Sequence, residues 1–315
     1  MRPSPARAAL GLVGLGAASV AGAVVESRAY VLRRIELPVL APGARSVRVL
    51  HLSDLHLTPW QRREREWVRG LAALEPDLVV DTGDNLAHLE AVPAVLDALA
   101  PLLELPGVFV LGSNDYYAPK PKNPARYLQR EGGRKRIKGT RLPTQDLVDG
   151  LTAAGWLDLD NRRDRLGVAG LAMSFVGVDD PHLRLDRFPE PEPKPDPKSQ
   201  VAPVDLAVGV LHAPYERVLD AMAGEGARLI LAGHTHGGQL RLPGVGALVT
   251  NCDLDRRRAR GVTRWWTGAG RVAADHAPPP DASWLHVSAG LGTSPYTPVR
   301  FCCRPEASLL TLTAP

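Results

Sequence analysis

Cysteine is scarce in this chain of 315 residues, which contains three: Cys252, Cys302 and Cys303. Adjacent residues such as Cys302 and Cys303 do not readily bridge each other, an odd total leaves one thiol over, and no C-x-x-C motif is present. The sequence therefore does not indicate a disulfide framework or a thiolate metal site. We interpret the cysteines as small core residues.

A strong excess of one charge is also lacking. The chain has 38 Lys and Arg against 34 Asp and Glu, a formal net charge of +4 that is spread along the sequence. This balance is not the footprint of a specific nucleic-acid-binding protein. It suits an anionic substrate or an anionic membrane, or is simply a solvated surface. With 44% hydrophobic residues and no visible internal repeat, the chain is expected to build one sizeable core.

One apolar run, Ala8 to Val25, lies near the N-terminus behind Arg2 and Arg7. Basic residues before an apolar stretch and the sequence Ala21-Gly22-Ala23 are typical of a signal peptide, whereas about 18 residues is also the short end for a membrane-spanning helix. We expect the protein to be membrane-associated or exported, with the side of the membrane left open. The predicted division is an N-terminal signal or anchor segment with linker, residues 1–45, and one domain, residues 46–315.

From Ser46 onward, predicted strands and helices alternate. Apolar strands at 47–52, 78–80 and 108–111 are separated by amphipathic helices at 64–74 and 91–103. This order predicts a βαβαβ unit with a largely parallel sheet, and thus an α/β fold. Further helices are expected at 142–155 and 216–223, a hairpin at 166–178, and strands at 206–211, 228–231, 247–250, 284–287 and 309–312.

Two segments are expected to lie outside the regular elements. Residues 116–141 carry many Lys and Arg among tyrosines, which is typical either of a solvated insertion or of a basic rim that attracts phosphate groups or lipid headgroups. Residues 188–197 alternate proline with mostly charged residues, which predicts a surface loop.

Several predicted strands end in side chains that bind metal ions. Because ligands of parallel sheets lie beyond the carboxyl ends of the strands, these side chains are expected to meet. Imidazole and carboxylate without thiolate suit Mn, Fe, Zn or Ni, and seven groups exceed one tetrahedral ion but suffice for two divalent metal ions. Two cations roughly 3.5–4 Å apart can clamp a phosphoryl group and lower the pKa of a water that then attacks it. The candidate ligands are Asp54, His56, Asp84, Asn114, His212, His234 and His236.

These motifs, in this order, resemble the calcineurin-like metallophosphoesterase superfamily. They read Asp54-x-His56, Gly83-Asp84, Gly112-Ser113-Asn114-Asp115, His212 and Gly233-His234-x-His236, and the tail Gly290-Leu291-Gly292 with Arg304-Pro305-Glu306 resembles a membrane-associated bacterial branch. The resemblance implies a four-layer αββα sandwich of two mixed β-sheets. It also implies a hydrolase acting on phosphomono- or phosphodiesters. One metal would be held by Asp54, His56 and His236, the other by His212 and His234, with Asp84 bridging.

One motif departs from the family pattern. Where the family has Asn followed by His, this chain has Ser113 followed by Asn114. An amide does not transfer protons in a useful pH range, so Asn114 does not replace the histidine as an acid. Either Asn114 is a metal ligand after a local shift, which we favour, or Ser113 fills that position while Asn114 contacts the phosphate. The catalytic candidates are therefore Asn114 and Asp115, the acid that follows.

The missing histidine leaves open a catalytically reduced metal-binding protein, and the basic segment leaves open a membrane-surface adaptor that binds anionic lipids. His88, His182 and Asn251 are candidates for the rim of the site. His51 and Asp81 are expected to point away from the ligands or to support them from behind. We expect a phosphate ester as the substrate, while the sequence indicates neither which ester it is nor the oligomeric state.

Overall fold

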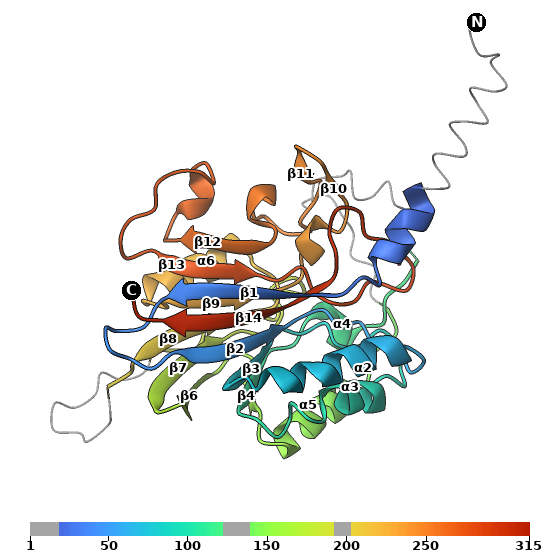
Figure 1. The fold of residues 1–315 in the computed structure, drawn as a ribbon, viewed down its shortest axis with the longest axis horizontal. Helices are drawn as coiled ribbons and strands as arrows, with labels where there is room; N and C mark the ends of the chain where they lie inside the picture. The colour runs from blue at the N-terminus through green and yellow to red at the C-terminus, as the bar shows by residue number, and fades with distance from the viewer. Residues whose placement is uncertain (1–18, 122–138, 192–202) are drawn as a thin grey trace, which may run out of the picture.

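Two mixed β-sheets lie face to face in the computed structural model, which describes residues 19–121, 139–191 and 203–315 (Figure 1). The first sheet has the order β1-β14-β2-β3-β4-β5, and the second has the order β12-β13-β9-β8-β7-β6. The first contains β1 (Val31–Pro38), β14 (Glu306–Thr313), β2 (Val47–Leu52), β3 (Leu78–Asp81), β4 (Gly107–Phe109) and β5 (Leu157–Asp158). The second contains β12 (Gly261–Trp265), β13 (Ser283–Val287), β9 (Leu229–Ala232), β8 (Leu206–Val210), β7 (Leu171–Gly177) and β6 (Arg163–Val168).

Helices cover the outer face of each sheet. Against the first sheet lie α2 (Arg62–Gly70) with the short helix η1 (Leu71–Leu74), α3 (Val92–Leu99) and α5 (Thr144–Ala153). Against the second lies α6 (Glu216–Gly224), followed in the chain by a small hairpin of β10 (Arg241–Leu242) and β11 (Gly246–Ala247). The remaining short helices are α4 (Ser113–Tyr116), η4 (His236–Gly238), η5 (Arg256–Arg258) and η6 (Ala269–Arg271).

Strand β2 shows why the sequence folds into layers. Its residues Val47 and Val49 pack between the two sheets, whereas Leu50 and Leu52 pack under the helices. Apolar side chains on both faces are what a strand covered on both sides requires. Three buried clusters result, one between the sheets and one beneath each helical layer, so the predicted four-layer αββα sandwich is confirmed.

Most predicted elements occur, with shifted ends. The unit β2-α2-β3-α3-β4 has neighbouring parallel strands, as predicted. The helix predicted at 64–74 is α2 followed by a 3₁₀ turn, the helix predicted at 91–103 ends at Leu99, and the strand predicted at 247–250 is reduced to the bridge β11.

Strand β1 was not predicted. Val31–Pro38 lies within the segment interpreted as a linker, yet it pairs in parallel with β14 along its whole length. Its arginines Arg33 and Arg34 hide the apolar alternation, and its partner lies at the other end of the chain. The core domain therefore includes residues N-terminal to position 46.

Parts of three predicted segments lie outside the described residues: most of the apolar run Ala8 to Val25, the middle of the basic segment 116–141 and most of the proline-rich segment 188–197. Within residues 19–121, 139–191 and 203–315, no helix combines the length and the apolar character needed to span a bilayer.

Candidate metal centre

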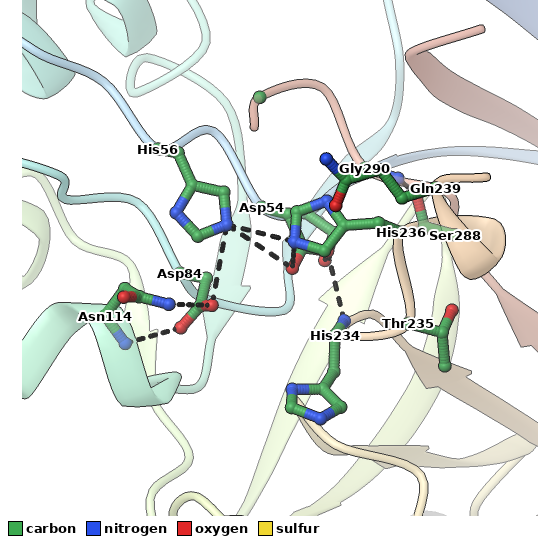
Figure 2. A network of polar contacts seen from close by, with 12 residues as sticks. Asp54, His56, Asp84, Asn114, His234, Thr235, His236, Gln239, Ser288 and Gly290 are labelled. Atoms are coloured by element: carbon green, nitrogen blue, oxygen red, sulfur yellow. Dashed lines mark hydrogen bonds and ion pairs between the residues drawn. The ribbon is translucent and has the colours of Figure 1, made fainter. Parts of the chain in front are cut away.

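The predicted ligands meet where strands of both sheets end. The loops after β2, β3 and β4 bring Asp54, His56, Asp84 and Asn114, and the loops after β8 and β9 bring His212, His234 and His236. Backbone hydrogen bonds join two of these loops, since the N–H of Asp54 donates to Gly83 O at 2.8 Å and the N–H of His56 donates to Asp84 O at 2.9 Å. The two sheets thus supply opposite walls of one site (Figure 2).

Asp54, His56 and His236 form a first group of converging ligand atoms. The Nε2 atoms of His56 and His236 are 3.1 Å apart, and Asp54 Oδ1 lies 4.0 Å and 3.5 Å from them. Asp54 Oδ1 is buried and has no hydrogen-bond partner among the described residues. Burial raises the pKa of this carboxyl, and the neighbouring Asp84 raises it further against the opposing effect of His212. A buried oxygen without a donor, facing two imidazole nitrogens, fits a divalent cation.

A second group comprises Asp54, Asp84 and His212. Asp84 Oδ1 lies 3.4 Å from His212 Nε2, while Asp84 Oδ2 lies 3.6 Å from His56 Nε2. His234 joins this group through its Nδ1, which is 3.3 Å from His212 Nε2. The two oxygens of Asp84 therefore face different groups, which is the placement expected of a bridging carboxylate.

The pKa shifts of three of the four histidine ligands favour metal binding. Burial lowers the pKa of His56, and burial together with neighbouring imidazoles holds the pKa of His234 and His236 well below the usual range. These imidazoles are neutral at pH 7, which is the form that binds a metal ion. Despite its burial, Asp84 has a pKa well below its ordinary value because His212, His56 and the Asn114 N–H stabilise its charge.

Carbonyl oxygens fix the orientation of two histidines. His212 Nδ1 lies 2.7 Å from Thr82 O, and His234 Nε2 lies 3.2 Å from Asn251 O. Each of these nitrogens donates to its carbonyl. For His234 this leaves the opposite ring nitrogen with a lone pair directed into the site. Despite burial, the nearby charge of Asp84 raises the pKa of His212 well above its usual value, so His212 Nε2 has to lose its proton when a cation binds. Asn251, a predicted rim residue, thus takes part through its backbone.

The side chain of Asn114 faces the predicted ligands, whereas that of Asp115 binds the backbone behind them. Asn114 donates from its backbone N–H to Asp84 Oδ1 at 2.7 Å and from Nδ2 to Asp84 Oδ2 at 2.6 Å. Asp115 is fully buried and accepts hydrogen bonds from the backbone N–H groups of Gly112, Asp84, Asn85 and Leu86. Asp115 thereby holds the loop that carries Asp84.

Sharp backbone turns aim the ligands at one point. Asp54, His56, Asp84, His234 and His236 have φ of 52°, 44°, 60°, 69° and 48°, in the left-handed region that L-residues other than glycine rarely adopt. Such conformations cost on the order of 1–3 kcal/mol each and cluster at functional sites. Their concentration in the predicted ligands indicates that the loops are shaped for the site.

Arg300, Gly290 and Gly292 support the site and were missed as functional residues. Arg300 is buried and donates to the carbonyls of Ala289, Gly290 and Gly292, with its Nη2 3.4 Å from His236 Nδ1. The glycines let this loop approach the ligands, since a Cβ on Gly290 would lie 2.6 Å from Asp54 Cβ. A lone arginine far along the chain matches no ligand pattern, so the sequence offered no signal for it.

Replacing Gly290 by alanine is expected to displace Asp54 and to lower metal affinity at least tenfold. The new methyl group would overlap Asp54, and the φ of +66° is unfavourable for alanine. Metal retained after dialysis, measured by elemental analysis, checks this result. Gly167→Ala in β6 is the matched control, because open space surrounds that position. Equal metal affinity in both variants would show that the contact with Asp54 is unimportant.

Of the other two rim candidates, His182 lies beside the predicted ligands and His88 does not. The His182 ring lies 4.8 Å from the His234 ring, and its Nδ1 lies 3.1 Å from the Tyr215 hydroxyl. His88 packs instead against Trp60, with ring centroids 5.1 Å apart. His51, behind the site, contacts His286 of the other sheet at 2.8 Å and Thr82 at 3.0 Å.

An αββα sandwich that gathers carboxylates and neutral imidazoles at its strand ends is the architecture of metal-dependent phosphoesterases. Residues 47–238 match the family described as calcineurin-like phosphoesterase, and the chain belongs to this family.

Two relatives and two solved structures illustrate the similarity. The chain is 27% identical to a bovine "Transmembrane protein with metallophosphoesterase domain" over 261 residues, which is 78% of this chain and 53% of the relative, so it spans about half the length of that protein. It is 26% identical to an "Uncharacterized metallophosphoesterase" of Aquifex aeolicus over 302 residues, covering 92% of this chain and 95% of the relative.

A 5'-nucleotidase precursor from Thermus thermophilus is similar with a TM-score of 0.41 and 14% identity, covering 85% of this chain and 55% of that chain. The Haemophilus influenzae NAD nucleotidase is similar with a TM-score of 0.43 and 13% identity, covering 78% of this chain and 46% of that chain.

Proposed function

We propose that the protein is a dinuclear metallophosphoesterase that hydrolyses phosphomonoesters or phosphodiesters. The observation that carries this proposal is the pair of ligand groups that share Asp54, with Asp84 facing both. When bound, two divalent cations supply positive charge to the phosphoryl group and lower the pKa of the attacking water. Mn, Fe, Zn and Ni all suit these ligands.

The proposed ligands divide between the two positions. Asp54, His56 and His236 would hold one cation, and His212, His234 and Asn114 the other, with Asp84 between them. The short distance from the Asn114 side chain to Asp84 supports Asn114 over Ser113 as the ligand. The oxygen and nitrogen of an amide are alike in size. A half turn of the Asn114 amide group would therefore place Oδ1 where Nδ2 now lies, facing the proposed cation position.

Protein groups then orient the substrate and exclude water. The buried ligands form a floor in which charge is weakly screened, so the cations that they would hold would attract a phosphoryl oxygen strongly. Asn114 and the imidazole of His182 flank this floor and are the groups we assign to contact with the substrate. Asp115 acts through the loop that it holds.

We further propose that the N-terminal segment associates with a membrane. The apolar run Ala8 to Val25 supports this, as does the word transmembrane in the name of the bovine relative. The side of the membrane on which the domain lies is left to experiment. The functional domain then comprises β1 together with the predicted residues 46–315.

The test is to purify the full chain, load it with Mn, and measure metal content and hydrolysis of p-nitrophenyl phosphate and its bis ester. Two cations per chain with turnover of either compound is the expected result. Two cations without turnover would favour the catalytically reduced alternative, which the missing motif histidine suggests. Absence of metal, with binding to liposomes retained, would favour the membrane adaptor.

A further inference from the structure

A cavity of about 510 Å³ lies beside the metal centre and has no role in the proposed hydrolysis. Residues from three segments line it, around positions 27–30, 58–64 and 291–298, and none of the seven predicted metal ligands is among them. Gly292 separates the two sites, since a side chain at this position would run into the backbone of Leu55 and into His56 Cβ. The cavity is therefore a neighbour of the metal centre with its own lining.

Three arginines give the cavity a positive charge. Arg28, Arg62 and Arg63 line it, and none is paired with a carboxylate in the part of the chain that the structure describes. Arg62 and Arg63 stand in the first turn of α2, where positive charge opposes the helix dipole. Both side chains are exposed, and their charge makes the cavity attractive to an anion.

A buried carboxyl group also lines the cavity. Glu64 is 3% exposed, and its Oε2 accepts hydrogen bonds from the Tyr30 hydroxyl at 3.3 Å and from Gln61 Nε2 at 2.7 Å. Its Oε1 is buried without a partner among the described residues. Burial raises the pKa of Glu64 to about 8, so the group is mostly protonated at pH 7. A neutral carboxyl does not repel an anion and can donate one hydrogen bond to it.

Part of the lining is apolar, and the cavity adjoins the N-terminal segment. Trp60, which is 66% exposed, stands at the cavity together with Leu291, Pro295 and Pro298. A helical segment at residues 19–26, drawn in dark blue near the N-terminus in Figure 1, leads directly into Ser27 and Arg28 of the lining. On this segment Val20 and Val25 are 61% and 70% exposed. The arginines thus lie where an apolar segment meets the domain, which is the location expected of a site for lipid headgroups.

We propose that this cavity binds an anionic amphiphile, with its phosphate group on Arg28, Arg62 and Arg63 and its apolar part against Trp60. The ligand is a phosphate joined to an acyl-bearing or similarly apolar moiety. A lipid headgroup and a soluble organic phosphate share this phosphate chemistry, and the apolar contacts distinguish them. This site is separate from the metal centre and does not depend on the hydrolytic activity.

Binding of dihexanoylphosphatidic acid below its micelle concentration tests the proposal. The full chain is first freed of metal with a chelator, so that the metal centre does not bind the phosphate, and calorimetry is run at constant salt. Dihexanoylphosphatidic acid is expected to bind at least tenfold more tightly than glycerol 3-phosphate or inorganic phosphate. The double variant Arg62→Ala/Arg63→Ala should weaken binding at least tenfold while unfolding at an unchanged temperature.

The control is Arg65→Ala/Arg69→Ala, which removes two charges from the same helix at residues that pair with Asp97. It should change affinity less than twofold. Equal binding of glycerol 3-phosphate would show that a free organic phosphate is the ligand and would overturn the amphiphile. Equal losses of affinity in the two double variants would show that the effect comes from general surface charge. If the wild-type protein does not bind dihexanoylphosphatidic acid at all, the proposed site is refuted.

Discussion

Asp84→Ala is expected to abolish hydrolysis and to remove both metal ions from the protein. The two carboxylate oxygens lie 3.4 Å from His212 Nε2 and 3.6 Å from His56 Nε2, so one side chain serves both ligand groups. In a buried site its charge also offsets the repulsion between two cations, which is many kcal/mol at such short range. A loss of at least about 10³ in kcat/KM follows if one transition-state interaction of about 4 kcal/mol is lost.

Metal content measured alongside activity decides between roles for Asp84. Asp149→Ala on α5 is the matched control, since this carboxylate faces solvent and contacts Gln145. The control should retain two cations and full turnover. An Asp84→Ala protein that keeps both cations would contradict the bridging position. Loss of one cation would make Asp84 a ligand of a single ion.

The second large effect concerns the leaving group. With Asn114 in place of a histidine, no imidazole from this motif protonates the departing oxygen, and general acid catalysis is typically worth about 10² to 10⁴ in rate. We expect aryl phosphates such as p-nitrophenyl phosphate to be cleaved faster than alkyl phosphates by about this factor. A plot of log kcat/KM against leaving-group pKa should slope steeply downward.

A double substitution tests whether the motif causes the slope. Ser113→Asn with Asn114→His restores the family residues, and it should flatten the dependence by speeding alkyl substrates more than aryl ones. His182→Ala is the companion variant, because this ring lies beside His234. If the wild-type protein cleaves both classes at similar rates while chemistry limits turnover, another group is the acid. A slope that appears only in His182→Ala would identify His182 as that acid.

The convergence of the candidate ligands was predictable because they follow buried strands. Asp54, Asp84 and His234 each come within three residues of a strand end, and apolar runs of this kind are local features of the sequence. Parallel strands that point the same way bring such residues together, even when they are distant in the chain. His212 illustrates this, since an isolated histidine gains significance only through the strand before it.

Features that depend on distant contacts were not predictable. Arg300 matters because its loop returns to His236, and Gly290 matters because Asp54 lies against it. The motif Gly290-Leu291-Gly292 is visible in the sequence, but neither the contact of its first glycine with Asp54 nor that of Arg300 with His236 can be read from nearby residues. The left-handed backbone of the ligands is also invisible in the sequence, because aspartate and histidine are ordinary residues at loops.

Strand β14 has a consequence for the order in which the molecule assembles. The last strand of the chain lies between β1 and β2, parallel to the first and antiparallel to the second, so these two early strands never pair with each other. During synthesis both edges stay open until residues 306–313 leave the ribosome, and contacts of such long sequence separation form slowly. Removal of residues 306–313 would leave β1 without its partner strand and would expose one edge of β2 at the same time.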